Sequence, residues 1–240
     1  LPFRRPPTRE GSTAVKVSVV IPAFQAASYL GEAIDSVLAQ TAPPAEVVVV
    51  DDGSTDESSA VAASFGGTVR VVRQDHAGAN VARNRGVRES DGDLLAFLDA
   101  DDLWAPTKLA HQVAALGAET GPEIVFGLVT QFVSPEIPDG VVALPAGAGE
   151  PVVGHHLGAM LVRRETFAAV GPLDEDNDFG DFVDWFARAL DRGSRMTVVD
   201  QVVMRRRLHL ANKGRSAEAG PEQYARALAK VRARRRSGVG

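Results

Sequence analysis

The stretch that decides the fold of this chain is Leu94-Leu95-Ala96-Phe97-Leu98-Asp99-Ala100-Asp101-Asp102. Its apolar run has the length of a buried strand, and open α/β sheets bind their ligands at the carboxyl ends of such strands. The run ends in three carboxylates, two of which have the spacing Asp-x-Asp that suits a hard divalent cation and the phosphate it carries. Since a chain with 31 acidic residues contains such pairs by chance, the informative feature is the position of this pair at a strand end.

Strand and helix patterns alternate on both sides of this stretch. Continuous apolar runs predict strands at residues 15–21, 47–50, 69–72 and 124–133. Helical spacing, a capping-box pattern and a helix-initiating proline predict helices at residues 30–40, 54–65, 78–87 and 106–116. Because the strands are apolar without alternation, this order predicts an α/β fold in which helices cover both faces of a mostly parallel sheet. The Gly- and Pro-rich segment 135–154 is predicted to be a mobile loop.

The composition fits a single α/β domain and excludes several protein classes. The chain has 240 residues, of which 45% are hydrophobic, so a sizeable core is possible and global disorder is excluded. The absence of cysteine excludes disulfides and thiolate metal sites and favours a reducing compartment. No apolar run approaches the ~20 residues that span a bilayer, and the first residues lack the apolar core of a signal peptide. We therefore expect a cytoplasmic protein.

A net charge of −5 conceals a basic C-terminal end. Residues 204–240 contain eleven Lys and Arg against two Glu, a local charge of +9, whereas the rest of the chain carries −14. We predict a basic, helical tail at 211–240, which is either a solvated helix or a contact with an anionic membrane surface or a partner protein. We expect no nucleic-acid partner. Residues 1–14, rich in Pro and Arg, are predicted to form a flexible lead-in.

A second acidic strand end is Asp51-Asp52-Gly53-Ser54, just before a predicted helix. Two interpretations are open: a tight turn with a helix cap, which Gly53 and Ser54 would form without a ligand, or a carboxylate that binds the base or ribose of a nucleotide. Two acidic strand ends on one parallel sheet point to the same edge, and this favours the ligand.

Other polar residues carry weaker signals. Arg83 could bind a diphosphate, although alone it is better interpreted as a surface arginine. Three histidines show no metal-ligand spacing and are predicted to be ordinary polar residues of loops. They are His76, His155 and His156.

The segment 181–192 is predicted to be an amphipathic helix. At ~100° per residue, Val183, Phe186 and Leu190 share one face. The opposite face carries Asp181, Asp184, Trp185 and Arg188. This polar face is either an ordinary solvent face with an Asp184–Arg188 pair, or a face on the ligand cleft that presents a catalytic carboxylate. Periodicity alone leaves both interpretations open.

Taken together, these segments resemble the family 2 glycosyltransferases with a GT-A fold. The matching segments are Val17–Phe24, Ala33–Gln40, Val50–Asp56, Ala82–Gly86, Phe97–Asp102, Arg163–Phe167, Val170–Glu175 and Asp184-Trp185. The resemblance implies one domain over residues 15–210. Its Rossmann-like half (15–103) would bind a nucleotide sugar, and its second half (104–210) would hold the acceptor and the catalytic base.

The resemblance also implies the contacts of a nucleotide-diphosphate sugar, with UDP as the expected nucleotide. These contacts are Pro22, Ala23, Phe24, Asp51, Asp52, Arg83, Asp99 and Ala100. Within this set, the strand end at 22–24 would border the base, and Asp52 would hold the base or the ribose.

A Mn²⁺ or Mg²⁺ site and a catalytic base are implied as well. Asp101 is the preferred metal ligand, with Asp99 and His209, which ends an Arg-x-His segment, as further candidates. Many relatives carry Glu-Asp where this chain has Gly180-Asp181, so the acidic doublet is incomplete. Asp181 is the first candidate for the base and Asp184 the second.

The expected function is a metal-dependent inverting glycosyltransferase, in which one base activates an acceptor hydroxyl and no covalent nucleophile is needed. The acceptor is not identified by the sequence. One alternative is a non-catalytic nucleotide-sugar-binding protein, which the incomplete acidic doublet would suit. Another is a phosphohydrolase of the haloacid dehalogenase type, but that class carries Asp-x-Asp on its first strand and has Thr or Val at the position of Leu103.

Overall fold

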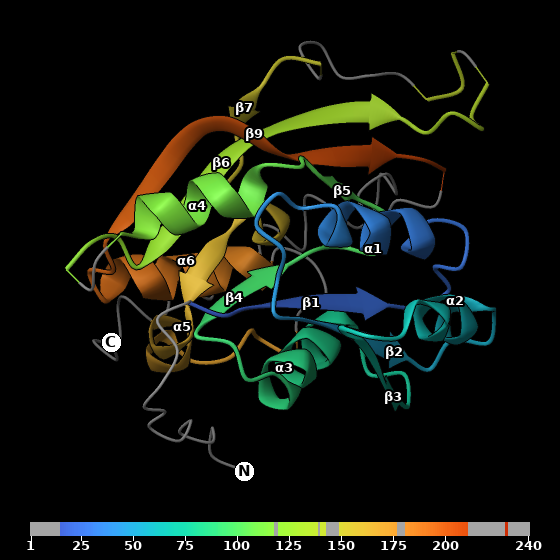
Figure 1. The fold of residues 1–240 in the computed structure, drawn as a ribbon, viewed down its shortest axis with the longest axis horizontal. Coiled ribbons are helices and arrows are strands. Elements are labelled where there is room, and N and C mark those ends of the chain that lie inside the picture. The colour runs from blue at the N-terminus through green and yellow to red at the C-terminus, as the bar shows by residue number, and fades with distance from the viewer. Residues whose placement is uncertain are drawn as a thin grey trace.

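The structure of the chain is a computed structural model in which helices flank a curled sheet (Figure 1). It describes residues 15–117, 120–138, 140–142, 149–176, 181–210 and 229. The predicted lead-in at 1–14 and, apart from residue 229, the predicted tail at 211–240 lie outside the described residues. None of the described helices has the length and apolar character that a membrane span requires.

The first half of the chain forms a parallel sheet, as its apolar runs predict. Its strands are β1 (Val17–Ala23), β2 (Glu46–Asp52), β3 (Val69–Gln74) and β4 (Leu94–Phe97). All neighbours in the order β3-β2-β1-β4 pair in parallel. The helices between them are α1 (Leu30–Leu38), α2 (Ser58–Phe65) and α3 (Ala79–Glu89). The predicted alternation of strands and helices is confirmed over this half.

The second half extends the same sheet with antiparallel pairings. Its elements are β5 (Leu103–Trp104), α4 (Lys108–Leu116), β6 (Ile124–Val133), β7 (Val152–Val153), the short 3-10 helix η1 (Leu157–Ala159), β8 (Leu161–Arg163), α5 (Arg164–Val170), α6 (Asp181–Asp191) and β9 (Met196–Leu208). Strand β8 is antiparallel to both β4 and β6, whereas the long strands β6 and β9 are parallel. Within the described residues, nine strands therefore form one sheet.

The two faces of this sheet carry separate apolar cores, because successive side chains of a strand point to opposite faces. On β1, Val19 and Ile21 belong to the core formed with α1, α2 and α4. Val20 belongs to the core formed with α3, α5 and α6. Helices α1 and α4 accordingly lie on one side of the sheet in Figure 1, and α3 and α5 on the other. The prediction that helices cover both faces is confirmed.

Helix α2 begins at Ser58, later than the capping-box pattern predicts. The predicted cap, Ser54, instead accepts a hydrogen bond from the backbone N–H of Gln25 at 3.1 Å. Asp56 accepts the backbone N–H of Ser58 at 3.0 Å. The capping box is wrong because Ser54 is used in a tertiary contact with the loop after β1.

The predicted apolar face of α6 is confirmed for Phe186, which packs against the core, and wrong for Leu190. Leu190 is 49% exposed, whereas Trp185, predicted on the polar face, is fully buried. Trp185 stacks on Phe167 with ring centroids 5.4 Å apart, and its indole Nε1 donates a hydrogen bond to the carbonyl of Gly171 at 3.0 Å. The helix therefore buries Trp185 and leaves Leu190 exposed, because burial of the larger aromatic surface stabilises the fold more.

Replacing Gly86 by alanine is expected to lower the free energy of unfolding by about 1–3 kcal/mol, because overpacking forces neighbours to move. A Cβ at this position of α3 would lie 2.3 Å from Val20 Cγ1 on β1. Urea unfolding of Gly86→Ala measures the effect. Gly31→Ala on α1 is the matched control, because its nearest atom would be Val61 Cγ1 at 3.8 Å. A loss of stability in both variants would contradict the packing argument.

Candidate active site

The predicted site lies where the parallel strands β1, β2 and β4 end. The β1–β2 register places Ala23 opposite Asp51, and the β1–β4 register places Val20 opposite Phe97, two residues before Asp99. Because the strands run in the same direction, the two acidic strand ends share one edge of the sheet. The strand ends that the sequence predicts at Asp51 and Asp99 therefore lie close together in the structure.

Asp51 is fully buried and forms the turn after β2. Its Oδ1 accepts the backbone N–H of Ser54 at 2.9 Å, and its Oδ2 lies 3.5 Å from the guanidinium of Arg73. Gly53 in this turn has φ +77°, which favours glycine. Asp51 therefore serves the tight-turn interpretation, and as it stands its side chain is not accessible to a ligand.

Asp52 holds the loop that leads into α3. Its Oδ1 accepts hydrogen bonds from Gln74 Nε2 at 2.7 Å and from the backbone N–H of Ala77 at 2.9 Å. Its Oδ2 accepts the backbone N–H of Gly78 at 2.9 Å and lies 2.9 Å from His76 Nδ1. Asp52 is 2% exposed, so a ligand at this strand end would contact neighbouring side chains and not the carboxylate itself.

Two stacked rings are exposed at this strand end. Phe24 is 44% exposed and stacks on His76, with ring centroids 4.0 Å apart and planes inclined by 24°. Phe24 was among the predicted nucleotide contacts, whereas His76 was not. No local pattern marks His76, because its position depends on the hydrogen bonds of Asp52.

Asp99 is clamped by a buried arginine at the end of β4. Arg83 on α3 donates from Nη2 to Asp99 Oδ1 at 2.7 Å and from Nη1 to Asn80 Oδ1 at 2.9 Å. Burial raises the pKa of Asp99, but Arg83, together with the imidazole of His156 and the guanidinium of Arg206, holds the pKa below its ordinary value. Arg83 is 8% exposed, so the interpretation as a surface arginine is wrong.

Asp101 lies beside the end of β9. Its Oδ2 is 2.9 Å from His209 Nε2, and its backbone carbonyl accepts Arg207 Nε at 2.9 Å. Arg207 also forms an ion pair with Glu32 on α1 at 2.6 Å and is 2% exposed. The Arg-x-His segment is thus fixed by ion pairing, and it places the imidazole of His209 against the Asp101 carboxylate, whose side chain is 32% exposed.

The third carboxylate of the stretch, Asp102, is structural. It is 3% exposed, and its Oδ1 accepts the backbone N–H of Arg207 at 2.8 Å. Burial and the neighbouring carboxylates of Asp101 and Asp99 raise its pKa well above the ordinary value. Asp102 therefore joins the end of β4 to β9 and leaves Asp99 and Asp101 as the accessible pair.

The donor set fits a cation whose coordination is completed by phosphate oxygens. Among the described residues, no group of three or more His, Asp or Glu converges to hold a metal ion. Asp101 and His209 form a convergent pair, whereas the Oδ1 of Asp99 is directed to Arg83. Mg²⁺-type sites often use one or two carboxylates together with substrate phosphates, and the pair around Asp101 meets this requirement.

The candidate bases lie on α6. Asp181 is the first residue of this helix, after a segment outside the described residues, and Asp184 lies within it. Asp184 Oδ2 accepts Arg188 Nε at 2.8 Å, the i,i+4 pair that the sequence left as one alternative. Arg188 also donates to the carbonyls of Val170 at 2.6 Å and Pro172 at 2.7 Å. This pair therefore braces α6 against the loop after α5.

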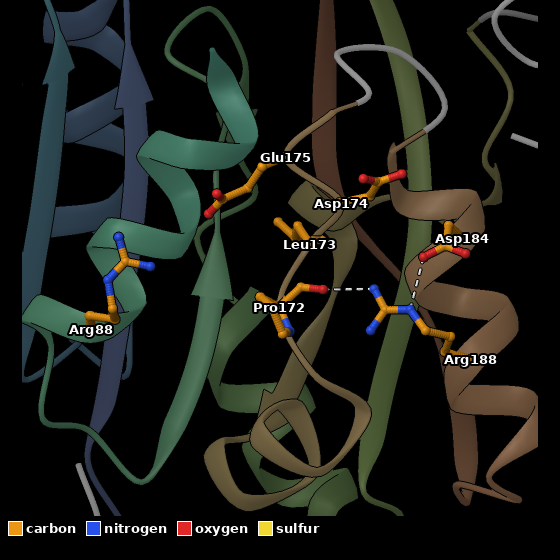
Figure 2. A pocket seen from close by; sticks show the side chains of 7 residues that line it. All are labelled: Arg88, Pro172, Leu173, Asp174, Glu175, Asp184 and Arg188. Carbon is orange, nitrogen blue, oxygen red and sulfur yellow. Dashed lines mark hydrogen bonds and ion pairs between the residues drawn. The ribbon is translucent and has the colours of Figure 1, made fainter. Parts of the chain in front are cut away.

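Asp184 and Arg188 line a pocket of about 510 Å³. Figure 2 shows that this pocket lies between α3 and α6. The remaining lining residues are Arg88, Pro172, Leu173, Asp174 and Glu175. Neither Asp99, Asp101 nor His209 belongs to this lining. The surroundings of Asp184 therefore differ from those of the Asp-x-Asp pair.

Comparison with known proteins identifies the class. The family model described as glycosyl transferase family 2 matches residues 18–135, and the fold is that of GT-A-type glycosyltransferases. The segment 18–135 belongs to glycosyltransferase family 2. Its Asp-x-Asp follows the fourth strand rather than the first, so the dehalogenase-type alternative is dropped.

Curated relatives match less than half of the chain. An uncharacterized glycosyltransferase of Rickettsia typhi is 36% identical over 109 residues, which cover 45% of this chain and 34% of that protein. One of Nostoc is 43% identical over 103 residues, which cover 41% of this chain and 32% of that protein. The chain thus spans about a third of the length of these relatives.

Solved structures match more of the chain. TarS of S. aureus, in complex with UDP-GlcNAc, has a TM-score of 0.70 at 19% identity and covers 90% of this chain and 65% of its own. The mannosyltransferase PcManGT of Pyrobaculum calidifontis, in complex with GDP-Man and Mn²⁺, has a TM-score of 0.62 at 23% identity and covers 92% of this chain and 64% of its own. At these identities the likeness shows the fold.

Proposed function

We propose that this chain is a metal-dependent inverting glycosyltransferase, which moves a sugar from a nucleoside diphosphate to an acceptor hydroxyl. UDP is the nucleotide that we propose for the donor. One observation carries the proposal. The carboxylates of Asp99 and Asp101 follow the end of β4, and both are partly exposed. Arg83 contacts the first at 2.7 Å, and His209 contacts the second at 2.9 Å. Membership of family 2 and the UDP-GlcNAc complex of TarS support the choice of donor.

The residues divide the chemical work between them. A divalent cation, Mn²⁺ or Mg²⁺, would be held by Asp101 and His209, and when bound it neutralises charge on the leaving diphosphate as a Lewis acid. Arg83 orients Asp99 toward the donor, and Phe24 with His76 provides the stacking surface for the base. Pro22 and Ala23 supply the strand-end backbone beneath it, and Ala100 spaces the two carboxylates.

Asp181 is proposed as the base. It would take the proton of the acceptor hydroxyl while the acceptor oxygen bonds to the anomeric carbon and the bond to the diphosphate breaks. One displacement from the face opposite the leaving group inverts the anomeric configuration. Asp184, paired with Arg188, is proposed to support the helix that carries this base.

The acceptor and the basic tail are less specific parts of the same proposal. The acceptor is a hydroxyl-bearing molecule. For residues 211–240 we keep the proposal of contact with an anionic membrane surface or a partner protein, on the strength of their charge.

The test is a calorimetric titration of UDP, GDP and dTDP, each with Mn²⁺ and with a chelator. We expect one nucleotide to bind at least about tenfold more tightly with Mn²⁺, a difference of about 1.4 kcal/mol. Absence of binding to all three would refute the proposed donor site. Binding of the nucleotide sugar without transfer or slow hydrolysis would instead favour the non-catalytic alternative.

A further inference from the structure

A gap between a carboxylate and an imidazole lies next to the two proposed metal ligands, Asp101 and His209. Asp99 Oδ2 and His156 Nε2 are 4.0 Å apart. Hydrogen bonds of this type measure about 2.7–3.2 Å, so the two groups face each other beyond direct contact. Their side chains are 29% and 39% exposed, respectively. The other oxygen of Asp99 is already held by Arg83.

The backbone fixes which nitrogen of His156 is the donor. The N–H of Gly158 donates to His156 Nδ1 at 3.0 Å, so Nδ1 must offer its lone pair. A neutral imidazole then carries its proton on Nε2, the atom that faces Asp99. The gap therefore has a hydrogen-bond donor on one side and an acceptor on the other.

This arrangement is built by buried side chains. Three of them hold successive carbonyls of the turn that follows His156. Trp104 Nε1 donates to the carbonyl of Gly158 at 3.0 Å, Gln112 Nε2 to that of Ala159 at 2.8 Å and Lys108 Nζ to that of Met160 at 3.2 Å.

Gly158 completes this support, because a Cβ there would lie 2.5 Å from Met204 Sδ and 3.2 Å from His156 Nδ1. The imidazole is thus positioned by the core, and not by a free loop.

A hydroxyl is the group that fits such a gap. Its oxygen can accept from Nε2–H and donate to Oδ2 while lying about 2.8 Å from each, a separation that matches atoms about 4 Å apart. A group that only donates or only accepts would satisfy one side alone. Sugars present hydroxyls, and the proposed donor carries them on both its ribose and its transferred sugar.

We propose that His156 and Asp99 together bind one hydroxyl of the nucleotide sugar and that His156 thereby determines which donor is accepted. The inference rests on the proposed function, since it needs a donor at the end of β4. It assigns a role to a histidine that sequence reasoning interpreted as an ordinary loop residue.

The test compares His156→Leu, which removes the N–H, with His156→Gln, which keeps one. Kd is measured by calorimetry with Mn²⁺ for UDP, 2′-deoxy-UDP, 3′-deoxy-UDP and UDP-glucose, or for the GDP series if the wild type binds GDP more tightly. His111→Leu, on the exposed side of α4, is the matched control. Unchanged thermal midpoints show that each variant is folded.

Loss of one neutral hydrogen bond is expected to weaken binding about 3–10-fold in His156→Leu, with at least partial recovery in His156→Gln. If the hydroxyl is on the ribose, UDP itself weakens, and one deoxy form binds wild type and variant equally. If it is on the transferred sugar, UDP is unaffected and UDP-glucose weakens.

Unchanged Kd values for every ligand, or equal losses in His156→Leu and His156→Gln, would overturn the inference while leaving the proposed function standing. Failure of the wild type to bind any nucleotide would instead overturn the proposed function, and this inference with it.

Discussion

Replacing Asp101 by asparagine is expected to lower kcat/KM for sugar transfer at least about 100-fold, because a metal ligand contributes several kcal/mol of charge stabilisation in the transition state. The side chain keeps its shape but loses the negative charge that faces His209 at 2.9 Å. The same variant is expected to bind UDP equally with Mn²⁺ and with chelator. Initial rates over a range of Mn²⁺ concentrations, together with calorimetry, measure both effects.

Asp35→Asn is the control for this variant, because Asp35 is an exposed carboxylate on α1 outside the site. It should leave rate and metal dependence at wild-type values. If Asp101→Asn keeps a Mn²⁺-dependent Kd, the metal must be held elsewhere, and the accessible carboxylate at the same strand end is Asp99. A fall in rate with unaltered metal dependence would thus separate a structural role of Asp101 from the proposed one.

The sequence predicts those parts of the site that depend on one strand end. The apolar runs place Asp51 at the end of β2 and Asp99 near the end of β4, and the parallel order brings them to one edge of the sheet. The resemblance to family 2 adds His209, whose contact with Asp101 joins residues 108 positions apart. No periodicity could have supplied that contact, because it depends on how β9 returns beside β5.

Contacts made by converging loops are not predictable in this way. His156 and His76 lack any spacing that marks a site, and each acquires its partner only when the chain folds. The saturation of Asp52 by three backbone or side-chain donors is likewise invisible in a motif. The error on α6 has a different cause. Periodicity weighs apolar residues alike, whereas the buried surface of Trp185 decides which face turns inward.

The other large effect is expected on α6. Asp181→Asn should lower kcat about 10²–10⁴-fold, the usual contribution of a general base, with little change in the KM for the donor. Loss of the base should also remove the acidic limb of the kcat–pH profile, since that limb reports its protonation. Steady-state kinetics with the donor varied, at several pH values, provide both measurements.

Asp184→Asn is the matched comparison, because it changes the same group three residues along the same helix. Asp184 is 8% exposed and holds Arg188, which in turn donates to one carbonyl at the end of α5 and to one in the loop after it. Weakening this pair is expected to cost about 1–3 kcal/mol of stability and to leave kcat within a few-fold of wild type. The opposite pattern, a folded Asp184→Asn without turnover beside an active Asp181→Asn, would move the base to Asp184. It would also bring the pocket of Figure 2 into the reaction as the side from which the acceptor enters.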